Sequence, residues 1–386
     1  MWHRCSKYGA TLTLLINTRY MSITESHYFS LLRAALWNTP VGIGEAIEWK
    51  AVMKIAEHHG NNGLLSDVAV RMTGDNKPAP EMLAKMQTTL RNGLLHQMRL
   101  RQILVSAVQL LREHGIEPVI LKGFGLALLY PNPSLRQFGD IDLFVGLDKF
   151  HEACALLRTL PGGYNWGEEQ DIGRHYNIEF GRYPMEVHRL SADIDDPKMR
   201  AVYEPIECDG LTENPRRVDL DGFEITVPSN EFQVFFTFYH AWHHFLTTGV
   251  GWRQVSDVAM TLHVYHGQLD LDKLNRWIAA MHLMKPWQAF GWLMVNTLGL
   301  PEAEMPFYDD RCQRTAQKLF RRIMETGNFK RQGGIKAPSK ERRLLHKMHA
   351  LLKIFIDFFY RARVFPANAF REMKATLGYA LSKQRE

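Results

Sequence analysis

Two short apolar runs, separated by a glycine-containing turn, constrain the fold of this chain more than any other feature. The first is Pro118-Val-Ile-Leu-Lys122, and the second is Asp140-Ile-Asp-Leu-Phe-Val145. Runs of this length bounded by turn residues are typical of buried strands, because a helix needs a longer periodic segment. The chain on both sides has apolar residues at helical spacing. The sequence therefore predicts an α+β fold with a small mixed-sheet core flanked by N- and C-terminal helical regions.

Breaks in the apolar pattern divide the chain into five segments. Glu81 to Glu113 lacks Pro and ends at His114-Gly115, a typical helix stop. Helical spacing returns after Ser229, which can cap a helix. We expect a leader or over-extended start at 1–23, an N-terminal helical region at 24–112, an α/β core at 113–228, a C-terminal helical region at 229–326 and a basic helical tail at 327–386.

Three further strands are predicted in the core. His175–Phe180 and Met185–Leu190 alternate apolar and polar residues on either side of the turn Gly181–Pro184, which predicts a hairpin. Phe223–Val227 has the pattern of one more strand, and Asp148–Leu160 that of a helix.

Paired aspartates are the first candidates for chemistry. An Asp-x-Asp pair on a strand points both carboxylates to one face, where they can share Mg²⁺ ions. The pattern alone is weak evidence, because it occurs four times: Asp140/Asp142, Asp193/Asp195, Asp219/Asp221 and Asp270/Asp272. The last three lie in polar surroundings and are predicted to be solvated loops or helix starts. The first lies in an apolar strand, where an unpaired carboxylate is costly.

The turn between the two apolar runs offers a phosphate site. Gly123 and Gly125 follow a strand end, and such glycines let backbone N–H groups approach phosphate at the start of a helix. Lys122 lies beside them, and Arg136, four residues before Asp140, could hold phosphate oxygens. The alternative is a tight turn next to an ion-paired strand, without a ligand.

The strings Leu121–Pro131 and Arg136–Leu143 resemble the uncharacterised bacterial nucleotidyltransferase family within the polymerase-β-like superfamily. That superfamily pairs a glycine turn with Asp-x-Asp on the next strand and takes a third carboxylate from a later strand. The resemblance covers roughly residues 25–300 and implies transfer of a nucleoside monophosphate from a nucleoside triphosphate (NTP), with Mg²⁺ or Mn²⁺ as cofactor and release of pyrophosphate. Phe124 stands where the superfamily usually has Ser or Gly, so a hydroxyl donor is absent, which Lys122 or Gly125 could replace.

The same resemblance implies roles for individual residues. Asp140 and Asp142 would bind the metals, while Glu186 would complete the second metal site and help to deprotonate the acceptor hydroxyl. Glu179, on the other arm of the predicted hairpin, is the competing third acid. His188 follows two residues after Glu186, so it is predicted to face the same side of the strand, toward the acceptor.

The helical half contributes two more groups. Arg253 and Asp257 have i, i+4 spacing, so they could form a plain helix pair or line the acceptor side of a cleft. His240 and His244 share a helix face, but no Glu follows His240 as in a zinc protease motif. The aromatic residues around them favour helix packing over a metal site.

Charge is unevenly distributed along the chain. The whole sequence carries a net charge of +6, whereas residues 311–386 have 19 Lys and Arg against 5 Asp and Glu, a net of +14. Such a tail could bind nucleic acid or an anionic membrane surface, or dock on the acidic body of the protein, which is the interpretation we favour. Four scattered cysteines and no long apolar span argue against a disulfide scaffold and a transmembrane helix, and we expect a cytoplasmic protein.

The sequence thus predicts a nucleotidyltransferase that uses NTP and an unidentified acceptor. A second possibility is a catalytically silent protein of the same fold that binds a nucleotide or a partner. A third is a glycosyltransferase, which also uses Asp-x-Asp to hold a diphosphate. That class requires a larger parallel sheet before the motif, where this chain has helical spacing.

Overall fold

The computed structural model describes residues 21–165, 175–192, 194, 196–327, 358–359, 361–371 and 373. Its α-helices are α1 (Ile23–Trp37), α2 (Trp49–His59), α3 (Asn62–Arg71), α4 (Pro80–Glu113), α5 (Phe124–Ala127), α6 (Gly146–Leu157), α7 (Pro197–Cys208), α8 (Asn230–Leu246), α9 (Trp252–Val264), α10 (Leu271–Ala280), α11 (Met284–Leu293) and α12 (Gln313–Thr326). Its strands are β1 (Val119–Ile120), β2 (Ile141–Phe144), β3 (Gly163–Asn165), β4 (His175–Phe180), β5 (Tyr183–His188), β6 (Arg216–Leu220) and β7 (Phe223–Val227).

The predicted α+β fold with a mixed sheet is confirmed. The described strands form one sheet in the order β3-β4-β5-β2-β1-β7-β6. β2 is parallel to β5 and β1 is parallel to β7, while the other neighbouring pairs are antiparallel. The hairpin predicted from alternating residues is the pair β4–β5. The strand β2, which carries Asp142, therefore lies at the centre of the sheet.

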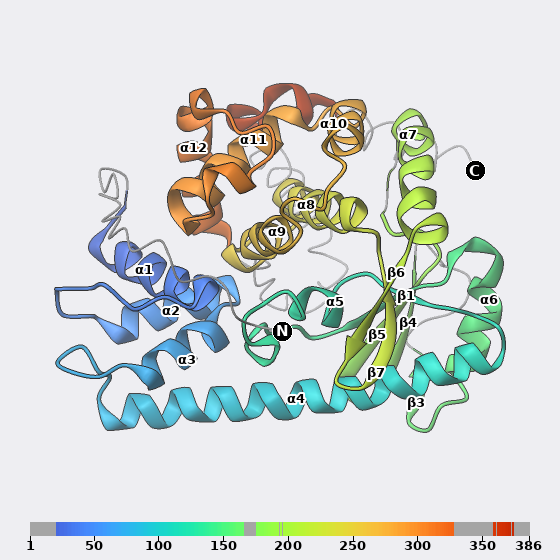
Figure 1. Ribbon diagram of the computed structural model, residues 1–386, viewed down its shortest axis with the longest axis horizontal. Helices are drawn as coiled ribbons and strands as arrows, with labels where there is room; N and C mark the ends of the chain where they lie inside the picture. Colours follow the sequence, from blue (N-terminus) through green and yellow to red (C-terminus); the bar gives the residue numbers. More distant parts are fainter. Residues whose placement is uncertain are drawn as a thin grey trace, which may run out of the picture.

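Two helices cover one face of this sheet. Leu104, Val108 and Leu111 of α4 share a hydrophobic cluster with Phe150 of α6 and with Leu143 of β2. The long helix predicted from Glu81 to Glu113 is confirmed, and Figure 1 shows α4 passing beneath α1–α3 before it reaches the sheet. One continuous helix thus connects the N-terminal helices to the α/β core.

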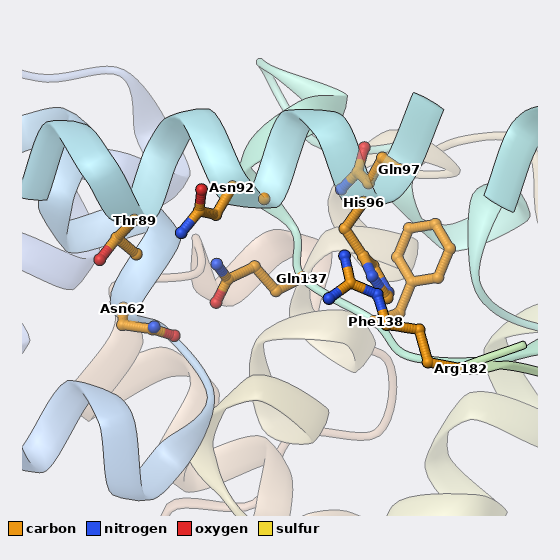
Figure 2. A pocket seen from close by; sticks show the side chains of 9 residues that line it. Asn62, Thr89, Asn92, His96, Gln97, Gln137, Phe138 and Arg182 are labelled. Carbon is orange, nitrogen blue, oxygen red and sulfur yellow. The ribbon is translucent and has the colours of Figure 1, made fainter. Parts of the chain in front are cut away.

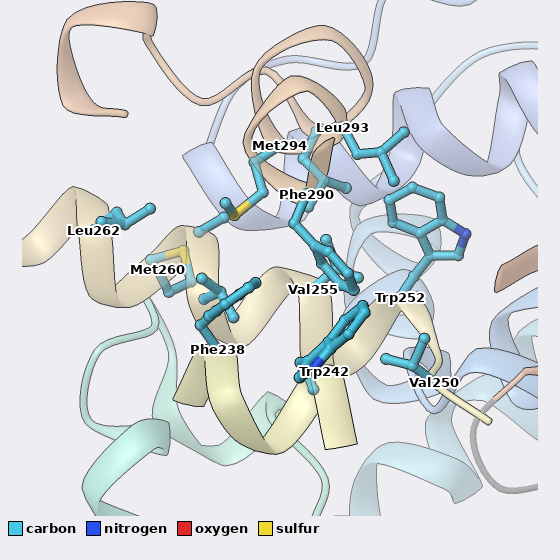
Figure 3. Close-up of a cluster of buried hydrophobic side chains, with 14 of the residues drawn as sticks. Phe238, Trp242, Val250, Trp252, Val255, Met260, Leu262, Phe290, Leu293 and Met294 are labelled. Carbon is cyan, nitrogen blue, oxygen red and sulfur yellow. The ribbon is translucent and has the colours of Figure 1, made fainter. Parts of the chain in front are cut away.

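The N-terminal and C-terminal helices pack together in a second hydrophobic cluster. Phe29 of α1 contacts Trp252 of α9 and Phe320 of α12, with ring centroids 4.6 and 5.6 Å apart. Figure 3 shows Trp242 and Phe290 converging with Trp252 in the centre of this cluster, which includes residues of α8, α9 and α11. α8 and α9 are thereby fixed beside the sheet.

Several predictions concern residues outside the described ranges. These are the leader, apart from residues 21–23, and the linker and basic helix predicted after Gly327, apart from a few residues near position 360. In the described part of the tail, Phe365 packs on Trp242 with ring centroids 5.1 Å apart. The described helices include none that is long and apolar enough to cross a membrane.

Candidate active site

Three carboxylates predicted from the sequence meet at the centre of the sheet. Asp142 of β2 lies directly opposite Glu186 of the parallel strand β5. Asp140 immediately precedes β2, and all three residues line the same cavity. The Asp142 side chain is fully buried, whereas that of Glu186 is 24% exposed. Asp142 was selected in the sequence because it lies in an apolar strand, and the structure shows that every residue of this strand is buried.

Two basic side chains contact these carboxylates. The Nζ atom of Lys122 lies 2.8 Å from Oδ1 of Asp142. The Nε2 atom of His188 lies 3.1 Å from the same oxygen and 3.3 Å from Oε2 of Glu186. His188 faces the same side of its strand as Glu186, as predicted. It is buried behind the carboxylates and is not among the residues that line the cavity.

The local charges determine which groups are ionised. Burial raises the pKa of Asp140, and the charge of Asp142 raises it further. Burial also opposes ionisation of Asp142, but Lys122 and His188 outweigh it and hold the pKa of Asp142 well below its usual value. Burial likewise opposes ionisation of Glu186, but the hydrogen bond with His188 and the charges of Lys122 and His175 together outweigh it, so that the pKa of Glu186 is lowered. Asp142 and Glu186 are therefore anionic at neutral pH.

The glycine turn lies beside the carboxylates. Gly123 has φ of +52°, a conformation that favours glycine, and a Cβ there would lie 3.4 Å from the Phe138 ring. A Cβ on Gly125 would lie 3.3 Å from Val227 and 3.4 Å from the Ile120 carbonyl oxygen. The backbone conformation thus requires Gly123, whereas Gly125 is only closely packed, whether or not the turn binds phosphate.

The guanidinium group of Arg136 forms hydrogen bonds with other residues of the protein. Its Nε and Nη2 atoms donate to the two carboxylate oxygens of Asp257 at 2.6 and 2.9 Å, and Nη1 donates to the Gly123 carbonyl at 3.2 Å. Tyr130 also donates to Asp257 at 2.8 Å. Burial alone would lower the pKa of Arg136, but the charge and hydrogen bonds of Asp257, with smaller contributions from Tyr130 and Asp140, outweigh it and the pKa is raised. Arg136 therefore connects α9 to the glycine turn.

Arg253 and Asp257 do not act as a plain helix pair. Asp257 binds Arg136 and Tyr130, while Nη1 of Arg253 donates to the Gln137 carbonyl at 2.9 Å. The Nε atom of Arg253 is buried and has no hydrogen-bond partner among the described residues. Burial and the nearby charge of Arg136 lower the pKa of Arg253. Its guanidinium group thus faces the cavity with unused hydrogen-bonding capacity.

The cavity has a volume of about 380 Å³, and most of the predicted site residues line it. Among the predicted residues, those that line it are Lys122, Gly123, Arg136, Asp140, Asp142, Glu186, Arg253 and Asp257. The other two predicted residues, Gly125 and His188, do not line this cavity. Glu179, the competing third acid, lies opposite Pro184 near the end of the hairpin and does not line this cavity.

Sequence reasoning gave too little weight to two histidines of α8. His240 and His244 line the cavity, and their Nε2 atoms are 3.0 Å apart. His240 also packs near Phe236, in line with the aromatic packing that was predicted. The i, i+4 spacing of the histidines was the available indication, because such residues share a helix face.

The remaining Asp-x-Asp pairs in the described ranges have local structural roles. Asp219 accepts hydrogen bonds from the Gly222 N–H in the β6–β7 turn, and Asp270 caps α10. Asp193 and Asp195 lie outside the described residues. The predicted helix start is thus confirmed for Asp270 and Asp272 and the predicted solvated turn for Asp221, whereas Asp219 is an exposed residue of strand β6.

The carboxylate group fits a divalent cation. Oδ2 of Asp142 is buried and has no hydrogen-bond partner within the described part of the chain. Carboxylate oxygens are the ligands that Mg²⁺ and Mn²⁺ prefer. His175, Glu186 and His188 add a neighbouring group whose ligand atoms lie within 4.8 Å of one another. Asp140, Asp142 and Glu186 line the cavity and could hold a hard cation at its wall.

Comparison with known proteins agrees with the predicted family. A search of curated proteins gives no match. Among solved structures, an antigenic nucleotidyltransferase-like protein from Paracoccidioides brasiliensis matches 52% of this chain and 92% of its own, at 13% identity and a TM-score of 0.33, too low to carry an argument. The model of the family described as uncharacterised nucleotidyltransferase matches residues 45–299, about two thirds of the chain. The chain therefore belongs to this family of uncharacterised nucleotidyltransferases.

Proposed function

We propose that the protein transfers a nucleoside monophosphate from an NTP to an acceptor hydroxyl or phosphate, with a divalent cation as cofactor. One observation carries this proposal. The fully buried Asp142 lies opposite Glu186 on a cavity wall, with one carboxylate oxygen unpaired in the described part of the chain. A buried carboxylate beside a partly exposed one is unfavourable unless cationic groups compensate both. Lys122 and His188 supply part of this compensation, and a metal ion would add to it.

Family membership supports the same conclusion. A nucleotidyltransferase family implies a nucleotide substrate. The resemblance to the polymerase-β-like superfamily implies a third carboxylate on a strand later than Asp-x-Asp. The parallel pairing of β2 with β5 puts Glu186 beside Asp142 and agrees with that implication.

In this proposal the carboxylates hold the cation. Asp140, Asp142 and Glu186 would be the ligands for Mg²⁺ or Mn²⁺, which would neutralise triphosphate charge when bound. Lys122 would then be released from Asp142 to contact a phosphate. His188 would keep the carboxylates in place from behind, through its contacts with Asp142 and Glu186.

The cavity also offers groups for the phosphates. Arg253 faces it with an unpaired Nε, which supports a role in binding phosphate oxygens. Gly123 and Gly125 would allow close approach of the nucleotide to the backbone. Arg136 would act by holding the turn, because it donates to the Gly123 carbonyl and to Asp257.

The reaction is a displacement at the α-phosphorus. The acceptor oxygen forms a new bond to the α-phosphorus, the bond from this phosphorus to the bridging oxygen of the β-phosphate breaks, and pyrophosphate leaves. The acceptor proton goes to Glu186, whose lowered pKa keeps it ionised as a base.

The test combines two double variants. Wild-type protein is incubated with Mg²⁺, each of the four labelled NTPs and cell extract, and labelled products and pyrophosphate are measured. We expect Asp140→Asn with Asp142→Asn to abolish transfer. The matched control, Asp219→Asn with Asp221→Asn, makes the same change in the β6–β7 turn and should transfer normally. Transfer that survives the first double variant would refute the metal assignment.

One outcome would favour the second candidate function. Phe124 stands where the superfamily that the chain resembles usually has Ser or Gly, and the absence of a serine hydroxyl there would weaken the phosphate site. Binding of labelled NTP to the wild-type protein without any product or pyrophosphate, in every extract tried, would indicate a catalytically silent nucleotide-binding protein.

A further inference from the structure

A second cavity lies beside the candidate active site. It has a volume of about 500 Å³ and is lined by residues of α3 and α4, by the segment before β2 and by the β4–β5 turn. Phe138 lines both cavities, and Arg253 of the first cavity donates to the Gln137 carbonyl in the wall of the second. The segment Gln137–Asp140 therefore runs from this cavity to the first aspartate of the site.

The lining is rich in neutral amides. Figure 2 shows Asn92 of α4, Asn62 of α3 and Gln137 around one space. Asn92 is exposed, and Asn62 and Gln137 are partly exposed, so the side-chain amides of all three are open to a ligand. A fourth amide, that of Gln97, is bound to the Arg136 carbonyl at 2.8 Å and fixes the adjoining loop. Three amides thus offer both donors and acceptors to a ligand.

Two glycines make room for Gln137. A Cβ on Gly93 of α4 would lie 3.3 Å from Nε2 of Gln137, and one on Gly63 of α3 would lie 3.2 Å from its Cδ. The Gly63 Cβ would also lie only 2.7 Å from the Leu135 carbonyl oxygen. Both helices therefore approach Gln137 closely, and its amide has a defined position in the cavity.

Charge limits the class of ligand. The nine described lining residues include no carboxylate, which disfavours a polycation such as an aminoglycoside. They include a single guanidinium, that of Arg182, which is too little for a polyanion such as RNA. His96 adds no charge at neutral pH, because burial lowers its pKa. Hydroxyl groups, which donate and accept as amides do, match the lining best.

We propose that this second cavity binds the acceptor and that the acceptor is a small uncharged polyhydroxyl compound of the sugar class. The proposal rests on the proposed nucleotidyl transfer, since Phe138 lines both this cavity and the one that holds the carboxylates of that reaction. An acceptor bound to Asn62, Asn92 and Gln137 would lie at the Gln137 end of the segment Gln137–Asp140, whose other end is the first aspartate of the site.

The first part of the experiment measures transfer of labelled nucleotide to candidate acceptors. Labelled NTP and Mg²⁺ are offered with glucose, mannose, galactose, N-acetylglucosamine and sorbitol, and with kanamycin and a short oligoribonucleotide as charged alternatives. We expect transfer to an uncharged compound. Asn92→Leu should raise the acceptor KM about tenfold, the effect of one lost hydrogen bond of about 1.4 kcal/mol, and leave the KM for NTP unchanged. The control Gln87→Leu changes an exposed amide of the same helix that does not line the cavity, and both KM values should stay as in wild type.

A binding arm separates this inference from the proposed function. Saturation-transfer NMR with the same sugars is run on Asp140→Asn/Asp142→Asn protein, which cannot transfer. Sugar signals that Asn92→Leu removes and Gln87→Leu retains would support the acceptor cavity even if wild-type protein transferred nothing. The absence of sugar signals, a best acceptor that is charged, or an unchanged acceptor KM in Asn92→Leu would overturn the inference and leave the metal site standing.

Discussion

The ion pair between Lys122 and Asp142 allows a quantitative test of the site. Lys122→Met removes the positive charge and keeps a long unbranched side chain. The pair joins two largely buried groups, since the side chain of Lys122 is 16% exposed and that of Asp142 is fully buried. Burial alone would lower the pKa of Lys122, but the charges of Asp142, Asp140 and Glu186 outweigh it and raise that pKa. The lysine is therefore charged and compensates a concentration of negative charge.

The magnitude follows from the distance. At 2.8 Å and an effective dielectric constant of about 20, the attraction is about 6 kcal/mol before desolvation. Removing one partner of a buried pair costs about 3–5 kcal/mol. His188 still contacts Asp142 at 3.1 Å in the variant, so we expect the lower end, a loss of about 3 kcal/mol in the free energy of unfolding.

Urea unfolding at pH 7, followed by tryptophan fluorescence, measures this loss. The matched control is Lys149→Met, which breaks the exposed pair with Glu152 and should cost at most about 1 kcal/mol. Mg²⁺ should stabilise Lys122→Met more than wild type, because the ion replaces the missing charge beside Asp142. The reasoning would be refuted by a variant as stable as the Lys149→Met control, or by equal stabilisation of variant and wild type by Mg²⁺.

Two further predictions concern Arg136 and His59. Arg136→Lys keeps the charge but loses the bidentate contact with Asp257. Urea unfolding should therefore show a loss of about 2 kcal/mol in the free energy of unfolding, the value of one charged hydrogen bond. An unchanged free energy of unfolding would mean that the bidentate contact is not needed for stability. Burial lowers the pKa of His59 from 6.5 to about 3. Between these two pH values the unfolded chain binds a proton at His59 that the folded protein does not bind. The free energy of unfolding should therefore fall as the pH drops below 6.5, by about 2 kcal/mol at pH 5. His59→Leu should remove this part of the pH dependence, and an identical pH profile in the variant would contradict the assignment.

Much of the fold follows from local patterns because the elements have clear periodicity. The helix at Pro80–Glu113 and the hairpin β4–β5 were predicted nearly to their ends. β6 was missed because three of the five residues of Arg216–Leu220 are charged, and because it is an edge strand that pairs, among the described strands, only with β7. β1 is only two residues long, because the turn at Gly123 follows almost at once.

The candidate site was predictable only in part. Asp142 could be identified because a carboxylate inside an apolar strand requires compensation. Lys122 and His188 were predicted to be in the site, but the contact of His188 with Asp142 was not, since the two residues are 46 positions apart and their contact depends on the register between β2 and β5. Spacing within one strand or helix predicts which residues share a face, but strand register has to be observed.

The two arginines of the cavity illustrate how position in the sequence misleads. Arg136 lies four residues before Asp140, which suggested a phosphate contact, yet its guanidinium binds Asp257, 121 residues later. Arg253 lies far from the motif in sequence, yet it lines the same cavity and its buried Nε is unpaired among the described residues. A phosphate contact requires unused donors, and Arg136 has already committed three nitrogens to Asp257 and Gly123. Arg253, together with Lys122, is therefore the better candidate for the phosphates, and Arg136 is the residue that keeps the glycine turn in register with α9.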